Sequence, residues 1–177
     1  HNVILEGLAG PLQEKQADLI QRGVKKIDQL LELINDLLDI ARIEAGKHVQ
    51  HRAPTDVEKI VHETVELIRP RAEEQGVTLS VACDESRPVQ ADPKGIGEVL
   101  SNLITNAVNY SPGGGRVEVT VKKRGDNLEI RVSDGGVGIP PEELPKIWDK
   151  FYRVKHPETR QVMGTGLGLA ITRGIVE

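Results

Sequence analysis

The chain has 177 residues, which is enough for one ordinary domain, or for a compact domain with a helical appendage, and for a core of real size. Its 23 basic residues stand against 27 acidic ones, and the net charge of -4 gives no reason to expect nucleic acid or an anionic membrane as a partner. The single cysteine, Cys83, excludes an internal disulfide and a metal site built on cysteines, and it is typical of a reducing compartment.

A cytoplasmic location is expected, because no stretch reaches the ~18 continuous apolar residues of a membrane span. The first residues also lack the basic and then apolar pattern of a signal peptide. Any membrane anchor of a longer protein is therefore expected outside this chain.

The first predicted element is a long amphipathic helix that ends near Gly46. Its apolar residues recur in alternating steps of four and three, which is the heptad pattern of a coiled coil. These residues are Ile20, Val24, Ile27, Leu31, Ile34, Leu38 and Ala41. A surface helix packed on its own domain shows a similar face, but a strict period over about 20 residues favours a helical bundle. Upstream, residues 7–11 read as a turn and residues 3–5 as the stub of an antiparallel first helix.

A linker is expected at residues 47–54, and then a helix that starts near Asp56 and runs to the helix terminator Gly76. Alternating apolar residues next predict three strands. Their inward faces are Val77, Leu79, Val81 and Cys83; Val117, Val119 and Val121; and Leu128, Ile130 and Val132. Helices are also expected around Glu98 to Tyr110 and after Pro140. The pattern predicts an α+β fold with helices on one face of a mixed or antiparallel sheet.

Three asparagines recur at i, i+4 and i+7 on one face of the helix that ends near Tyr110, namely Asn102, Asn106 and Asn109. Asn is a poorer helix former than Ala by roughly 0.6 kcal/mol, so the set costs about 2 kcal/mol. A solvated polar face is the alternative reading, but a face that only contacts water has no reason to bear this loss of helix stability. Neutral amide oxygens are suitable ligands for Mg²⁺, and Asn106 is the central candidate.

Two glycine-rich segments follow. The first, Asp134 to Ile139, places a carboxylate at a strand end before Gly136 and Gly138, so the backbone there can approach a ligand closely. A carboxylate can accept a hydrogen bond from an amine such as that of adenine, although ordinary strand-to-helix turns share this pattern. The second, Gly164 to Leu169, places glycines where a helix begins, and free N–H groups at such a point favour an anion.

Residues 139–163 separate the two glycine segments and hold three of the few aromatic residues, Trp148, Phe151 and Tyr152. A long, polar segment is more typical of a mobile lid than of a core element. Simple packing of the aromatic residues against the domain is an equally good reading of this cluster by itself.

Taken in order, these segments resemble the catalytic and ATP-binding domain of sensor histidine kinases, within the superfamily that includes gyrase, the HSP90 chaperones and MutL. Asn102 to Tyr110 is similar to the N box and Asp134 to Ile139 to the first glycine box. Phe151 is similar to the F box and Gly164 to Leu169 to the second glycine box. Each motif is modest alone, but four in this order are highly specific.

The heptad helix, which ends in Leu37 to Gly46, resembles the second helix of the family's dimerisation and phosphoacceptor hairpin. The resemblance therefore implies a partial hairpin at residues 1–50 and a catalytic ATP-binding domain at residues 51–177. The implied fold of that domain is the Bergerat fold, a two-layer α/β sandwich, with its last strand missing.

The resemblance implies ATP and Mg²⁺ as ligands, with Asn106 on the Mg²⁺, Asp134 on the adenine amine and Arg153 as a candidate partner of the terminal phosphate. Phe151 would tie the lid to the domain. The residues implied to line the nucleotide site are Asn102, Asn106, Asn109, Tyr110, Asp134, Gly136, Gly138, Ile139, Phe151, Gly164, Thr165, Gly166, Leu167, Gly168 and Leu169.

For the complete enzyme, the resemblance implies transfer of the γ-phosphoryl group to a histidine and then to an aspartate of a response regulator receiver domain. It also implies a homodimer formed through the helical hairpin. The family's acceptor motif is His-Glu followed by Arg or Lys, Thr and Pro. His1 is followed by Asn2 and Val3 instead, so the acceptor is expected on a first helix outside this chain.

The chain departs from the family pattern at two positions, since the family usually has Lys in place of Asn109 and Asn in place of Gly135. The loss of Lys removes a positive charge from the phosphate site unless Lys150, Arg153 or another lid cation replaces it. Two alternatives remain. An ATPase of the same superfamily would carry Glu where Asn102 stands, and a degenerate adaptor would use its bundle only for protein contacts.

Overall fold

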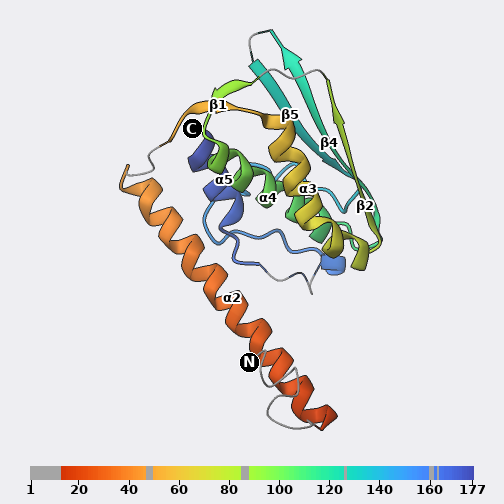
Figure 1. Cartoon of the computed structure of the whole chain (residues 1–177). Coiled ribbons are helices and arrows are strands. Elements are labelled where there is room, and N and C mark those ends of the chain that lie inside the picture. Colours follow the sequence, from red (N-terminus) through yellow and green to blue (C-terminus); the bar gives the residue numbers. More distant parts are fainter. Residues whose placement is uncertain (1–12, 47–49, 85–87, 126, 160–161, 163) are drawn as a thin grey trace.

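The computed structural model (Figure 1) describes residues 13–46, 50–84, 88–125, 127–159, 162 and 164–177. A long helix, α2 (Glu14–Glu44), extends from an α+β domain whose helices cover one face of a mixed sheet. The predicted fold class is confirmed. The turn and the helix stub expected before residue 12 lie outside the described residues. Within the described residues, no helix is both long enough and apolar enough to cross a lipid bilayer.

Helix α2 begins after Gln13, whose N–H donates to Gln16 Oε1 at 3.0 Å, and it ends before Gly46, which adopts a φ of 62°. The predicted heptad helix is therefore confirmed through its C-terminus. Its apolar stripe is largely uncovered in the single chain, with exposed fractions between 42% and 64%. The exposed residues are Leu19, Ile27, Leu30, Leu31, Ile34, Leu37 and Leu38.

Helix α3 (Val57–Glu74) starts where the sequence predicts, because the carboxylate of Asp56 accepts the N–H of Lys59 at 3.0 Å. The linker predicted at residues 47–54 is wrong at its C-terminal end. Residues 53–55 form a short strand, β1 (Ala53–Thr55), which pairs antiparallel with β3 (Val89–Ala91). Three-residue strands carry too little alternation to be recognised in the sequence, and only this long-range pairing defines them.

The main sheet has the order β2-β4-β5, formed by Val77–Cys83, Gly115–Arg124 and Asn127–Asp134. Strands β2 and β4 are parallel, whereas β4 and β5 are antiparallel, so the sheet is mixed. Helix α4 (Pro93–Asn109) lies on the connection between the two parallel strands and packs with α3 over one face (Figure 1). The residues of this main core with no exposed surface are Val61, Val65, Ala72, Ile104, Val108, Val117, Val119 and Val121.

Within the described residues, no α-helix follows Pro140 until Gly168. Residues 141–150 form successive turns instead, in which the N–H of Glu143 reaches the carbonyl of Pro140 and the N–H of Lys146 reaches that of Glu143, both at 2.9 Å. Pro145 explains the difference, because its ring removes a backbone donor and opposes a regular helix through this position.

Helix α2 packs on α5 (Gly168–Val176) through a second apolar cluster, in which Ile40, Leu167, Ile171 and Ile175 are buried. The contact is close. A Cβ atom placed on Gly174 would lie 2.6 Å from Cγ2 of Ile43. An ion pair between Lys150 and Glu44 of α2 lies beside the cluster.

The hydroxyl of Thr165 donates to Oδ2 of Asp36 at 2.6 Å, and it accepts the N–H of Leu167 at 3.2 Å. Burial raises the pKa of Asp36 above its ordinary value of 3.8, the bond from Thr165 partly opposes this, and the charge of Asp39 adds to it. A carboxylate on α2 is therefore held partly out of water against the second glycine segment.

We predict that Asp36 makes the chain more stable in acid than at neutral pH. Because the pKa of the folded state is raised, the stabilising contribution is complete below the unfolded pKa and is lost as pH rises through the folded value. Asp36→Asn should remove this part of the pH dependence of the urea unfolding midpoint, and Asp28→Asn, at an exposed site on the same helix, should keep it. Identical pH profiles for the two variants would contradict the prediction.

Candidate functional site

Helix α4 carries the three asparagines on the side away from its core face. It begins after Asp92, whose carboxylate accepts the N–H of Lys94 at 3.1 Å, and Pro93 suits its first position. Its buried residues are Gly95, Leu100, Ile104, Ala107 and Val108. The three asparagine side chains are only half-buried, as the predicted periodicity requires.

Each asparagine has a different environment. Asn102 donates from Nδ2 to the carbonyl of Gly168 at 3.3 Å, and a Cβ atom on Gly168 would lie 3.4 Å from Asn102 Oδ1. Asn102 therefore fastens the start of α5 to α4. Asn106 makes no side-chain hydrogen bond within the described part of the chain, which leaves its amide oxygen available to a ligand.

Asn109 contacts a cation that the sequence analysis missed. Nη2 of Arg71, in the last turn of α3, donates to Oδ1 of Asn109 at 3.0 Å. The cations expected to replace the missing lysine were on the lid, whereas Arg71 precedes Asn109 by 38 residues. Only the packing of α3 on α4 brings the two side chains together, and no local pattern in the sequence signals it.

The first glycine segment is attached to the C-terminus of α4. The N–H of Val137 donates to the carbonyl of Tyr110 at 3.1 Å, and the N–H of Gly136 donates to Oδ1 of Asp134 at 2.9 Å. A Cβ atom on Gly136 would lie 2.2 Å from the carbonyl oxygen of Tyr110, so no other residue fits. Gly138 adopts a φ of 70°, which also favours glycine. The structure therefore joins Asp134 and Gly136 to the asparagine helix.

The second glycine segment is attached to Phe151. The N–H of Phe151 donates to the carbonyl of Gly166 at 2.9 Å, and a Cβ atom on Gly166 would lie 2.8 Å from the carbonyl carbon of Phe151. Phe151 itself has a φ of 63°, and its side chain is 60% exposed. Its backbone, and not its ring, makes the connection.

Arg153 is also bound to the second glycine segment. Its guanidinium donates to the carbonyl of Gly164 at 3.2 Å and to the carbonyl of Val162. Thr165 is directed to Asp36 on α2, Leu167 is fully buried, and Ile139 remains exposed. The structure thus brings the four predicted motifs into a connected network of backbone and side-chain contacts.

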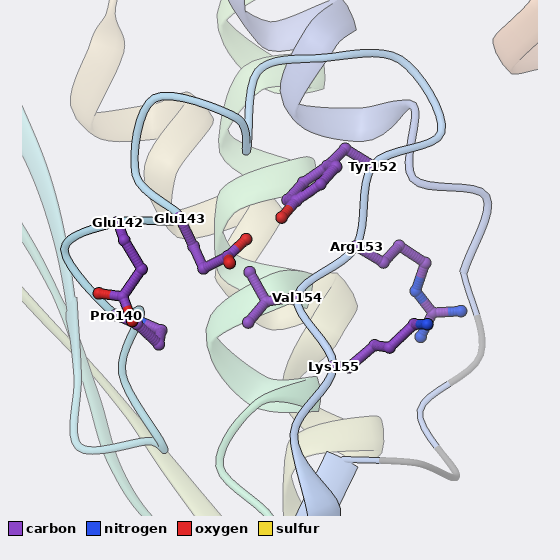
Figure 2. Close-up of a pocket in the computed structure, with 7 residues that line it drawn as sticks. All are labelled: Pro140, Glu142, Glu143, Tyr152, Arg153, Val154 and Lys155. Atoms are coloured by element: carbon purple, nitrogen blue, oxygen red, sulfur yellow. The ribbon is translucent and has the colours of Figure 1, made fainter.

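A pocket of about 390 Å³ lies within the segment that connects the two glycine motifs (Figure 2). Its lining residues are Pro140, Glu142, Glu143, Tyr152, Arg153, Val154 and Lys155. Figure 2 shows the hydroxyl end of Tyr152 directed toward Glu143, while the side chains of Arg153 and Lys155 extend together to the other side. Of the predicted site residues, only Arg153 lines this pocket. Asn106 and Asp134 therefore mark a separate part of the candidate site.

Two family profiles match the chain. Residues 91–177 match the family described as histidine kinase-, DNA gyrase B-, and HSP90-like ATPase. Residues 3–46 match the His Kinase A (phospho-acceptor) domain. The matches follow one another in the order that the long helix and the α+β domain have in the structure.

Curated relatives align over nearly the whole chain. The circadian input-output histidine kinase CikA of Synechococcus elongatus is 35% identical over 99% of this chain and 24% of its own length. The histidine protein kinase DivJ of Caulobacter vibrioides is 34% identical over 95% of this chain and 28% of its own length. The chain therefore spans about a quarter of the length of these relatives.

Solved structures share the same architecture. Full-length ShkA, determined in complex with AMPPNP, matches 94% of this chain and 35% of its own with a TM-score of 0.78 and 29% identity. A mycobacterial sensor histidine kinase, MprB, matches 71% of this chain and 78% of its own with a TM-score of 0.59 and 30% identity. Together with the two family profiles, these similarities show that the chain belongs to the sensor histidine kinases, as part of their dimerisation and catalytic region.

Proposed function

We propose that this chain binds ATP with Mg²⁺ and that, within a longer protein, it donates the γ-phosphoryl group to a histidine. The phosphoryl group then passes to an aspartate of a response regulator receiver domain. The observation that carries this proposal is the network of contacts that joins α4, both glycine segments and Phe151. Phosphoryl transfer depends mainly on positioning and charge neutralisation, and such a network provides the positioning.

Asp134 is the proposed contact of the adenine amine. It lies at the end of β5 and is exposed, and the N–H of Gly136 holds one of its carboxylate oxygens. The side chain is thereby oriented before a nucleotide binds. Gly136 and Gly138 lack side chains that would occupy the space beside it, so a flat ring can approach the backbone.

Asn106 is the proposed ligand of Mg²⁺. Its half-buried amide has no hydrogen-bond partner in the described part of the chain, and an amide oxygen is a hard ligand of the kind that Mg²⁺ accepts. The bound ion would supply positive charge to the phosphate oxygens. Asn102, which is engaged with Gly168, is proposed to position the start of α5 beside the phosphates.

The phosphates are proposed to lie against the second glycine segment and two arginines. The guanidinium of Arg153 donates to the carbonyl of Gly164 and contributes a positive charge from the lid. Arg71 contributes a second cation from α3, next to Asn109, where the family usually has a lysine. A guanidinium can bind phosphate oxygens with two parallel hydrogen bonds, so Arg71 compensates for the missing charge.

The long helix is proposed to form a homodimer. Its apolar stripe repeats in heptads and is about half exposed in the single chain, so a second hairpin would bury it in a four-helix bundle. We propose that residues 1–50 belong to this hairpin and residues 51–177 to the catalytic domain, within a cytoplasmic region of the longer protein.

The first prediction from this site is that Asp134→Ala strongly weakens the binding of ATP and of ADP. Loss of a hydrogen bond to a charged group costs about 1.5–3 kcal/mol, which corresponds to roughly a 10- to 150-fold loss of affinity. Asn106→Ala should remove mainly the Mg²⁺-dependent part of the affinity, which is the part that EDTA also removes. Titration calorimetry measures both effects, with Asp28→Ala on α2 as the control. Unchanged affinity in both site variants would overturn the site assignment, and no binding by the parent chain would favour the adaptor alternative.

The second prediction concerns Arg71. Arg71→Gln should weaken the binding of ATP and ADP by about tenfold but leave the binding of adenosine unchanged, because the arginine is proposed to contact only phosphates. Arg69→Gln is the matched control, since Arg69 lies on the same helix but pairs with Glu66. An equal loss for adenosine would indicate a packing defect, and an unchanged ATP affinity would place Arg71 outside the phosphate site.

The third prediction is that this chain, incubated with Mg-ATP, neither labels itself at His1 nor hydrolyses ATP appreciably. Self-labelling requires a histidine held within attack distance, and no acceptor motif surrounds His1. Hydrolysis requires a base for water, and the amide of Asn102 cannot act as one. Labelling should appear when a hairpin with the acceptor histidine is supplied. Acid-labile radiolabel that survives His1→Ala would show that another residue accepts phosphate.

A further inference from the structure

A second group of metal-ligating side chains lies near the N-terminal end of α3, where this helix packs on the end of β2. Glu58 and His62 are one helical turn apart on α3, and Cys83 is the last residue of β2. The proposed nucleotide site uses none of these residues. Arg71, its contact from the same helix, is in the last turn of α3, at the other end.

The three side chains converge. One carboxylate oxygen of Glu58, one ring nitrogen of His62 and the sulfur of Cys83 all lie within 4.8 Å of one another. Ligands on a tetrahedral zinc ion, at about 2.0–2.3 Å from the metal, are roughly 3.5 Å apart. Small side-chain rotations therefore suffice to bring the three ligand atoms around one ion, and His62 is exposed enough to admit it.

The backbone around the cluster is rigid. Cys83 pairs with Val121 in the parallel ladder, and the next N–H, that of Asp84, donates to the carbonyl of Val121 at 3.0 Å. Val57 and Val61, which flank Glu58 and His62 on α3, are buried in the main core. The ligands thus come from two elements that the core holds together, as a preorganised metal site requires.

We propose that Glu58, His62 and Cys83 bind a divalent cation of the zinc class. A thiolate, an imidazole and a carboxylate form a mixed set that suits Zn²⁺ and disfavours Mg²⁺, which prefers oxygen ligands. Three protein ligands leave a fourth position for water or another donor. A lone cysteine excludes a site made of several thiolates, but the structure adds a histidine and a carboxylate to it.

The electrostatics of the cluster are consistent with a cation. Burial raises the pKa of the Cys83 thiol, and the negative charges of Glu58 and Asp84 raise it further. These carboxylates oppose a bare thiolate but attract a divalent ion, which would balance two of the three negative charges. Binding would link the first turns of α3 to the end of β2. The proposal is independent of nucleotide binding.

Titration of the whole chain with Co²⁺, without nucleotide, tests the proposal. Because Cys83 is the only cysteine, a thiolate-to-cobalt charge-transfer band reports this residue alone. We expect one equivalent to bind with that band, Zn²⁺ to displace it and Mg²⁺ to leave it unchanged. Zn²⁺ should also slow the reaction of the thiol with Ellman's reagent at least tenfold.

Matched variants assign the ligands. His62→Gln and Glu58→Gln should weaken Co²⁺ binding at least tenfold, and Cys83→Ser should abolish the band. His51→Gln and Glu63→Gln, an exposed histidine and an exposed glutamate outside the cluster, should behave like the parent chain. If Cys83→Ser impairs folding, as judged by circular dichroism without metal, the two glutamine variants and thiol protection still decide the question.

Two results would overturn the proposal. One is Co²⁺ binding without a thiolate band, which would place the ion on other residues. The other is equal affinity of His62→Gln and His51→Gln for the ion. Nucleotide binding should persist in all the variants, so failure of the metal site is distinguishable from failure of the proposed nucleotide site.

Discussion

The packing of α4 on the sheet is the constraint on which the rest of this structure depends. Leu100, Ile104 and Val108 lie against strand residues such as Val119, which has no exposed surface. Burial of one such side chain contributes about 1.5–3 kcal/mol, whereas a single amide hydrogen bond contributes about 1 kcal/mol. Apolar packing therefore sets the rotation of the helix about its axis. This rotation places the three asparagines on the side of the helix away from the core.

Once α4 is in place, its middle and its C-terminus position the two glycine segments. The carbonyl of Tyr110 accepts a hydrogen bond from the N–H of Val137, and the side-chain amide of Asn102 donates one to the carbonyl of Gly168. Both approaches depend on the absence of a side chain, most clearly at Gly136, where a Cβ atom would overlap the backbone of Tyr110. Glycine thus allows close packing of the backbone at these positions, besides leaving room for a ligand.

The second glycine segment also connects the domain to the long helix. Thr165 links the N–H of Leu167 to the carboxylate of Asp36, and Ile43 rests on Gly174. The start of α5 is therefore in contact with both α4 and α2. A displacement of α2 along α5 would break the bond to Asp36 and disturb the loop that we propose to hold phosphates, so the two parts of the chain are mechanically coupled.

The sequence by itself determined the long heptad helix, the boundaries of α3, the three strands of the main sheet and the α+β class. These features rest on local periodicity and on capping residues such as Asp56 and Gly76, whose effects act within a few residues of the chain. The order of the motifs that we propose for nucleotide binding was also readable, because a carboxylate, asparagines and glycines at short fixed spacings are local signals.

Only the tertiary structure decided how distant residues meet. The pairing of β1 with β3, the contact of Arg71 with Asn109 and the cluster of Glu58, His62 and Cys83 join segments that are far apart in the chain. Turns follow Pro140 at residues 141–150, where Pro145 opposes a regular helix. Periodicity reveals which face of an element is buried, but the partner that covers this face depends on packing of the whole chain.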